Sequence, residues 1–227
     1  MTDTITMVEF ASMIAGAAQQ IRENSALLSQ LDSIAGDGDH GATMLRTVDC
    51  LQQSLSTAGT TDFSTVLHDA GWAVLSVDGG ASTSLLGSFF MGMGDPSAAK
   101  ASWLDRAGFS SLLTAGLKAV QKQTKAHPGD KTMMDALVPA VEVFSAAAMA
   151  GEDIGTALAR AAEAASFGAG STKDLIARHG RARLLGEKTR GSQDPGATSI
   201  ALIFEGFSLG FKQLSQEAQR ASSGDLA

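Results

Sequence analysis

Apolar residues recur along most of the chain at intervals of three and four positions, the spacing that places them on one side of a helix. In the first such run the apolar positions are Val8, Met13, Ile14, Ala17, Ile21, Leu27 and Leu28, and the run ends before Gly36. The same spacing predicts a helix that begins near residue 81 and further helices over residues 41–56, 63–75, 102–123, 132–149, 153–167 and 195–217. No stretch alternates apolar and polar residues in the manner of a strand.

The composition favours closely packed helices in one domain. Of the 227 residues, 44% are hydrophobic, so a sizeable core can be buried. Aromatic residues make up only 5% and tyrosine is absent, so small side chains fill the interior and favour helices over a β-sandwich. No internal repeat or low-complexity linker divides the chain. The sequence therefore predicts an all-α bundle of about eight helices, with a polar, frayed tail over residues 216–227.

Charge and cysteine content exclude several classes of protein. The net charge of −7 and the lack of a basic patch exclude a nucleic-acid-binding protein. Cys50 is the only cysteine, so neither an intramolecular disulfide nor a thiolate metal site is expected. The first ten residues lack the basic start and apolar run of a signal peptide. The longest apolar stretch, residues 136–150, is too short to span a bilayer. We expect a cytoplasmic protein without a membrane partner.

The loop over residues 31–41 carries the clearest chemical signal. Asp32, Asp37 and Asp39 place three carboxylates within eight residues, and like charges this close repel unless cations lie among them. Aspartate is a short, acceptor-only side chain that suits hard cations such as Mg²⁺. The alternative is a solvated turn in which Asp39 caps the next helix.

Two similar motifs do not apply to this loop. Gly36, Gly38 and Gly41 match the spacing of a dinucleotide-binding fingerprint, but the preceding segment is helical and aspartates fill the variable positions. The loop is not an EF-hand, because Val48 stands where a glutamate is needed. No P-loop sequence is present either. Metal binding through the three aspartates, or a solvated turn, are the interpretations that remain.

Three further turns lead into predicted helices. The turn over residues 78–84 is rich in glycine and hydroxyl residues. It forms either a phosphate cradle or an ordinary serine cap. The turn over residues 193–199 follows a basic cluster that includes Arg181, and predicts either a cationic clamp on phosphate or surface charge before a proline-initiated helix. The turn over residues 128–132 precedes Met133 and Met134, which we expect in the core. His40 is the one histidine that we expect at the site.

These loops, in this order, resemble the L subunit of dihydroxyacetone kinase, its nucleotide-binding component. The resemblance covers residues 8–212 and implies that residues 1–215 form the L-type domain. It rests on residues 31–32 with 36–41, residues 79–82 with Gly87 and Phe89-Phe90, residues 128–133 with Asp135, residues 180–182 with 185–187, and residues 193–199. The sequence departs from the family where Thr43 replaces an expected Asn, Thr124 an expected Gly, and Thr83-Ser84 an expected Gly-Pro.

The resemblance implies an all-α barrel of eight antiparallel helices with the nucleotide, ADP or ATP, at one end. It implies two Mg²⁺ ions held by Asp32, Asp37 and Asp39, and Arg181 as a phosphate clamp, with no other catalytic residue assigned. The implied nucleotide contacts are His40, Gly41, Ala42, Thr43, Ala81, Ser82, Thr124, Met133, Arg181, Asp194, Pro195 and Gly196. Phosphoryl transfer depends on positioning and charge neutralisation, which such a site supplies.

The resemblance also implies partners. In the family a separate K subunit holds the ketose covalently through a histidine, so this chain would be half of a dihydroxyacetone kinase. The phosphoryl donor would be either exchangeable ATP or a phosphohistidine phosphocarrier protein that rephosphorylates bound ADP. A C4 ketose such as erythrulose is an equally good acceptor from the sequence, and self-association is compatible with it. The alternative function is an ADP-bound regulator that docks a transcription factor.

Overall fold

The computed structural model describes residues 3–57 and 62–223, and the described part is almost entirely helical. Its eight α-helices are α1 (Met7–Ser33), α2 (His40–Thr57), α3 (Phe63–Leu75), α4 (Gly80–Gly94), α5 (Arg106–Gln123), α6 (Met134–Met149), α7 (Ile154–Ser171) and α8 (Pro195–Ser223). Three short 3-10 helices join them: η1 (Ser97–Lys100), η2 (Thr172–Asp174) and η3 (Arg181–Thr189). The predicted all-α class is confirmed.

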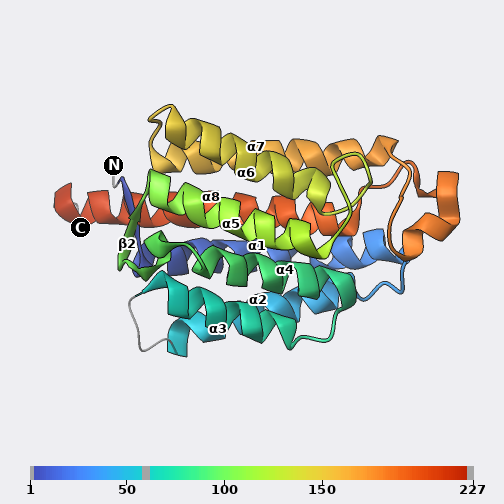
Figure 1. Cartoon of the computed structure of the whole chain (residues 1–227), viewed down its shortest axis with the longest axis horizontal. Helices are drawn as coiled ribbons and strands as arrows, with labels where there is room; N and C mark the ends of the chain where they lie inside the picture. The colour runs from blue at the N-terminus through green and yellow to red at the C-terminus, as the bar shows by residue number, and fades with distance from the viewer. Residues whose placement is uncertain (1–2, 58–61, 224–227) are drawn as a thin grey trace.

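The eight helices form a closed antiparallel barrel. Each helix packs against the next one in the sequence, and α8 returns to pack along α1. Because successive helices run in opposite directions, the even-numbered helices begin at one end of the barrel and the odd-numbered helices at the other (Figure 1). We call these the even end, on the right in Figure 1, and the odd end, where both termini lie.

Small residues allow the barrel to close tightly, as the composition predicted. Gly16 of α1 faces Gly206 of α8, and a Cβ atom added to Gly16 would lie 2.2 Å from the Gly206 carbonyl oxygen. The two helices can approach this closely only because neither position carries a side chain. The core between the helices holds the large buried side chains, including edge-to-face pairs such as Phe10–Phe63 and Phe109–Phe144.

Two short strands were missed by the sequence analysis. Strand β1 (Thr4–Thr6) pairs antiparallel with β2 (Trp103–Asp105) at the odd end. Ile5 stands opposite Leu104, and both side chains are buried. The prediction of no strand was therefore wrong. The helix predicted over residues 102–123 is present as α5, but its start was placed four residues too early, since α5 begins at Arg106. Strands of three residues are too short to show an alternating pattern.

The last helix extends beyond the predicted end at residue 217. The backbone of α8 remains helical to Ser223, and residues 224–227 lie outside the described part of the chain. The domain boundary drawn at residue 215 stays a prediction. The helix η3 was not predicted, because its sequence is polar and lacks a helical repeat of apolar residues. No described helix combines the length and the apolar character that a membrane span needs.

Candidate functional site

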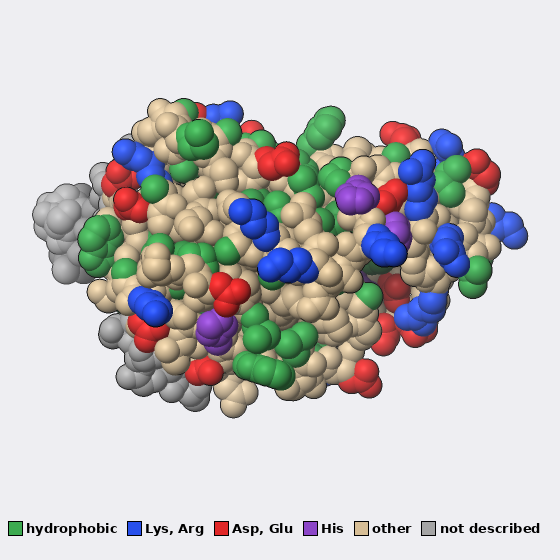
Figure 2. All heavy atoms as spheres, viewed as in Figure 1, with side chains coloured by type: hydrophobic (Ala, Val, Ile, Leu, Met, Phe, Trp, Pro, Cys, Tyr) green, Lys and Arg blue, Asp and Glu red, His purple; other side chains and the backbone are tan. Residues whose placement is uncertain are grey.

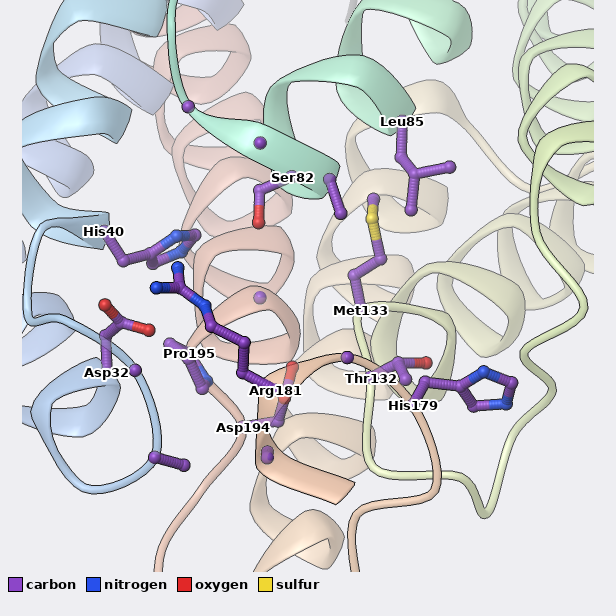
Figure 3. A pocket seen from close by; sticks show the side chains of 18 of the residues that line it. Asp32, His40, Ser82, Leu85, Thr132, Met133, His179, Arg181, Asp194 and Pro195 are labelled. Atoms are coloured by element: carbon purple, nitrogen blue, oxygen red, sulfur yellow. The ribbon is translucent and has the colours of Figure 1, made fainter. Parts of the chain in front are cut away.

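A cavity of about 640 Å³ opens at the even end of the barrel, a size typical of small-ligand sites. It is lined by the first residues of all four even-numbered helices, namely His40 of α2, Gly80 of α4, Met134 of α6 and Pro195 of α8. A helix N-terminus carries partial positive charge and free N–H groups. In Figure 3 the labelled side chains come from several of these segments and surround one hollow. The cavity is therefore suited to an anionic ligand.

The acidic loop, which runs from the last turn of α1 with Asp32 to the start of α2, forms one wall of this cavity. Asp32, Asp37 and Asp39 each offer a carboxylate oxygen, and these oxygens lie within 4.8 Å of one another. The loop is folded so that the Gly38 N–H donates to Asp32 Oδ2 at 2.8 Å. Gly38 takes a positive φ of 77°, which glycine adopts at little cost. A donor set made only of carboxylate oxygens fits a hard cation such as Mg²⁺.

The three carboxylates are unequally compensated. Arg181 donates to both oxygens of Asp37, at 2.5 and 3.2 Å. This guanidinium lowers the pKa of Asp37 to about 2. The pKa of Asp39 is instead raised, first by desolvation and then by the negative charge of Asp37. Arg181 supplies one positive charge to a cluster of three carboxylates. The remaining negative charge favours a bound cation.

His40 connects two of the converging helix starts. It is buried at the beginning of α2, and its Nε2 lies 2.7 Å from Ser199 Oγ on α8. Burial lowers the pKa of His40, which favours the neutral imidazole. A neutral ring can serve as a hydrogen-bonding group at the cavity without adding positive charge.

The turn before α4 lines the cavity, and no side chain caps the start of the helix. Gly79 precedes the helix and forms no side-chain cap, and Gly80 follows with a positive φ of 64°. Arg46 of α2 donates to the Asp78 carbonyl and to Thr43 Oγ1, each at 3.0 Å. The N–H groups in the first turn of α4 therefore have no side-chain cap acceptor and face a cavity suited to an anion.

The turn before α6 is fixed by a buried carboxylate. Asp135 accepts from the Gly129 N–H at 2.6 Å and from the Thr132 N–H at 2.7 Å. These bonds set the position of Met133, which is buried and lines the cavity. The expectation of Met133 as a core residue is therefore confirmed for its burial, although its side chain also forms part of the cavity wall.

The turn before α8 is fixed by a buried lysine. Lys131 donates to the Thr172 carbonyl at 2.6 Å and to the Ser192 carbonyl at 2.5 Å, and burial lowers its pKa. Asp194 accepts from the Ala197 N–H at 2.7 Å, and burial raises its pKa to about 7. Lys131 therefore joins the end of α7 to the turn that starts α8.

Most of the residues expected at the site meet at this cavity. All three predicted metal ligands line it, and so do nine of the twelve predicted nucleotide contacts: His40, Ala81, Ser82, Thr124, Met133, Arg181, Asp194, Pro195 and Gly196. Gly41, Ala42 and Thr43 are not among the lining residues. Gly41 packs against α1, since an added Cβ atom would lie 2.0 Å from the Ser25 carbonyl oxygen. The assignment of these residues to a nucleotide stays a prediction.

Among the cavity residues that the sequence analysis did not assign are Arg46, Lys131, Thr132 and His179. His179 was set aside in favour of His40, yet it lines the cavity and its Nε2 lies 3.1 Å from Asp130 Oδ2. Lys131 and Thr132 lie within the turn that the sequence analysis had singled out, so their position could have been inferred. Nothing local in the sequence distinguishes Arg46.

The fold and the site together define an α-helical barrel with a cluster of three carboxylates, suited to a cation, beside a cavity suited to an anion. The chain belongs to the DAK2 domain family, whose model matches residues 34–209. It is 36% identical over 186 residues to the PEP-dependent dihydroxyacetone kinase 1, ADP-binding subunit DhaL, of Listeria innocua, a match that covers 82% of this chain and 87% of the relative.

Two longer proteins match over part of their length. The L-erythrulose 1-kinase of Mycolicibacterium smegmatis is 36% identical over 193 residues, which are 82% of this chain and 33% of that protein. Among solved structures, the dihydroxyacetone kinase of C. freundii in complex with AMP-PNP and Mg²⁺ superimposes with a TM-score of 0.68 at 26% identity. That match covers 88% of this chain and 33% of the solved chain.

Proposed function

We propose that this chain is the nucleotide-binding subunit of a ketose kinase. It would hold ADP or ATP in the cavity at the even end and pass a phosphoryl group to dihydroxyacetone bound by a partner. The observation that carries this proposal is the position of Asp32, Asp37 and Asp39 at the wall of a cavity lined by four helix N-termini. The relatives named as ADP-binding subunits of dihydroxyacetone kinase support it.

The proposed roles follow from the position of each group. Asp32, Asp37 and Asp39 would hold Mg²⁺, with two ions as the family resemblance implies. When bound, Mg²⁺ neutralises the charge of the phosphate oxygens and orients them for in-line transfer. The uncapped start of α4 would bind phosphate through its N–H groups. Met133 and Thr124 line the cavity and would contact the nucleotide farther from the acidic loop.

The acceptor is proposed to lie on a second protein. The Listeria innocua relative is named as one subunit of its kinase, which favours a K-type partner subunit that holds the ketose. Its description as PEP-dependent favours a phosphocarrier protein as the source of the phosphoryl group, with bound ADP as its acceptor. The erythrulose kinase relatives keep a C4 ketose as the second candidate substrate.

Reconstitution tests this proposal. The purified chain with Mg²⁺, ATP and dihydroxyacetone should form no sugar phosphate, as followed by phosphorus NMR. Addition of a dihydroxyacetone kinase K subunit should give turnover, either with ATP or after addition of a phosphocarrier system. Erythrulose in place of dihydroxyacetone identifies the preferred ketose through the ratio of kcat/KM values.

Two results would contradict parts of the proposal. Product formed by the chain alone would show that the acceptor site does not need a partner. Tight binding of Mg²⁺ and ADP without turnover under any of these conditions would favour the ADP-bound regulator. A protein that binds neither Mg²⁺ nor ADP would refute the assignment of the cavity itself.

A further inference from the structure

Arg181 is the link between two segments that lie 144 positions apart in the sequence. Its Nη1 donates to Asp37 Oδ2 at 2.5 Å and its Nη2 donates to Asp37 Oδ1 at 3.2 Å. Both carboxylate oxygens of Asp37 are therefore engaged by the guanidinium. Figure 3 shows Arg181 reaching across the cavity towards Asp32 and His40. The pair is largely exposed, with 67% of the Arg181 side chain and 52% of the Asp37 side chain accessible.

The segment that carries Arg181 follows two residues that contact Asp130, and it contains two turns at glycines with positive φ. Below the segment, Asp130 accepts from Arg178 at 3.3 Å and faces His179 at 3.1 Å. Gly180 and Gly186 take positive φ values of 63° and 54° on either side of the first half of η3. Within the described part of the chain, the two bonds from Arg181 are the only hydrogen bonds that join residues 181–189 to the acidic loop.

Arg181 and a divalent ion would compete for the carboxylate of Asp37. Its oxygens belong to the cluster of carboxylate oxygens within 4.8 Å of one another that would hold a divalent ion. A guanidinium that forks onto both oxygens occupies a lone pair on each of them and neutralises the charge that would attract an ion. Figure 2 shows basic side chains beside acidic ones at this end of the molecule.

We infer that Arg181 is a displaceable counter-cation of the proposed metal site, bound to Asp37 when no divalent ion is present and released from Asp37 when one binds. The inference rests on the proposed function, because it takes the three aspartates as metal ligands. Release frees the planar guanidinium, a group that binds phosphate in a bidentate manner, at the mouth of the cavity. It also removes the hydrogen bonds that hold η3 to the acidic loop, so ion binding and the freedom of η3 are linked reciprocally.

Arg181→Gln tests the competition without using activity. Binding of Mn²⁺ alone, without nucleotide, is measured by electron paramagnetic resonance on wild type and variant. Loss of the competing guanidinium should lower the Kd for Mn²⁺ by about two- to fivefold, the range expected for release of an exposed ion pair. Arg183→Gln is the matched control, since it removes one positive charge from the same exposed segment without touching Asp37. Arg181→Lys, which keeps the charge and loses the fork, should fall between wild type and Arg181→Gln.

Hydrogen exchange supplies the second readout. In wild type, Mn²⁺ alone should increase exchange over residues 181–189, whereas in Arg181→Gln that segment should exchange rapidly with or without the ion. Equal Mn²⁺ affinity in wild type, Arg181→Gln and Arg183→Gln would overturn the inference. So would hydrogen exchange over residues 181–189 of wild type that does not change when Mn²⁺ is added. Neither result would contradict the proposed metal site. An equal gain of Mn²⁺ affinity in Arg181→Gln and Arg183→Gln would show that only the loss of a positive charge matters. That result would also overturn the inference. Failure of both wild type and Arg181→Gln to bind Mn²⁺ would instead refute the proposed metal site.

Discussion

Four α-helices begin at each end of the barrel, but the side-chain capping of their first turns differs between the two ends. At the odd end each helix start is capped by a side chain that accepts from a backbone N–H: Thr6 for α1, Asp62 for α3, Asp105 for α5 and Asp153 for α7. At the even end α4 begins after Gly79, which makes no side-chain cap bond. The start of α6 has a side-chain acceptor one residue before Met133, since Thr132 Oγ1 accepts from the Met134 N–H at 3.2 Å. Asp194 is the acidic group that supports the start of α8.

This difference separates stability from binding. A side-chain cap satisfies N–H groups that would otherwise be unpaired and so stabilises the helix. A helix start without such a cap leaves its N–H groups for water or for a ligand. The antiparallel order of the barrel brings four starts together at each end. At the odd end all four starts have a side-chain cap, whereas at the even end the start of α4 has none and lines the cavity.

The largest expected effect comes from removing a charge at the even end. Asp37→Asn should weaken Mg²⁺-dependent ADP binding by roughly 100-fold or more, because even residues that only support a metal ligand cost about 10–100-fold when mutated. Isothermal titration calorimetry with Mg²⁺ and with EDTA measures the effect. Asp105→Asn is the matched control at the odd end, where ADP affinity should stay at the wild-type value.

Melting curves sharpen the same comparison. Mg²⁺ and ADP at a hundredfold excess over the dissociation constant should stabilise wild type by about 2.7 kcal/mol, a rise in Tm on the order of 5–10 °C for a chain of this size. Asp37→Asn should gain almost nothing under the same conditions. A variant that still binds and is stabilised like wild type would show that the acidic loop is an ordinary turn.

A smaller effect, confined to stability, is expected at the odd end. Asp105→Ala removes the acceptor of the Gly108 N–H, a bond of 2.7 Å at the start of α5. Loss of such a cap typically costs about 1 kcal/mol in the free energy of unfolding, which urea denaturation can measure. ADP affinity should not change. A drop in affinity as large as that of Asp37→Asn would mean that the two ends are not independent.

The smallest expected effect is a pH dependence at the start of α7. The pKa of Asp153 is lowered from 3.8, mainly by the hydrogen bond from the Thr156 side chain. The charged form of the carboxylate is therefore more stable in the folded protein than in the unfolded chain. Its contribution to stability is fully present above pH 3.8 and is lost as pH falls through the lower pKa of the folded state.

Asp153→Asn should remove this contribution. Urea denaturation of both proteins over a pH series should show a stability difference that is constant above pH 3.8 and shrinks below it. A difference that grows as the solution is acidified would have the wrong sign for a lowered pKa. The contribution does not depend on ligand, so Mg²⁺ and ADP should leave the pH profile of the difference unchanged.

Several features of the molecule were determined by the sequence alone. The helical repeat located all eight α-helices, because an amphipathic pattern is a local property of neighbouring turns. The clustering of Asp32, Asp37 and Asp39 within one loop was enough to make them the candidate ligands, since residues so close in sequence cannot be far apart in space. The family resemblance and these local patterns together predicted twelve nucleotide contacts, of which nine line the cavity.

Other features depended on the tertiary structure. The pairing of Ile5 with Leu104, the tie from Lys131 to Ser192 and the bridge from Arg181 to Asp37 each join segments far apart in the chain. No local pattern encodes them, because each depends on the tertiary fold that brings distant segments together. The sequence by itself determined which segments are helical and which loop is acidic. The closed antiparallel packing decided which loops meet, since it brings all the even-numbered helix starts to one end.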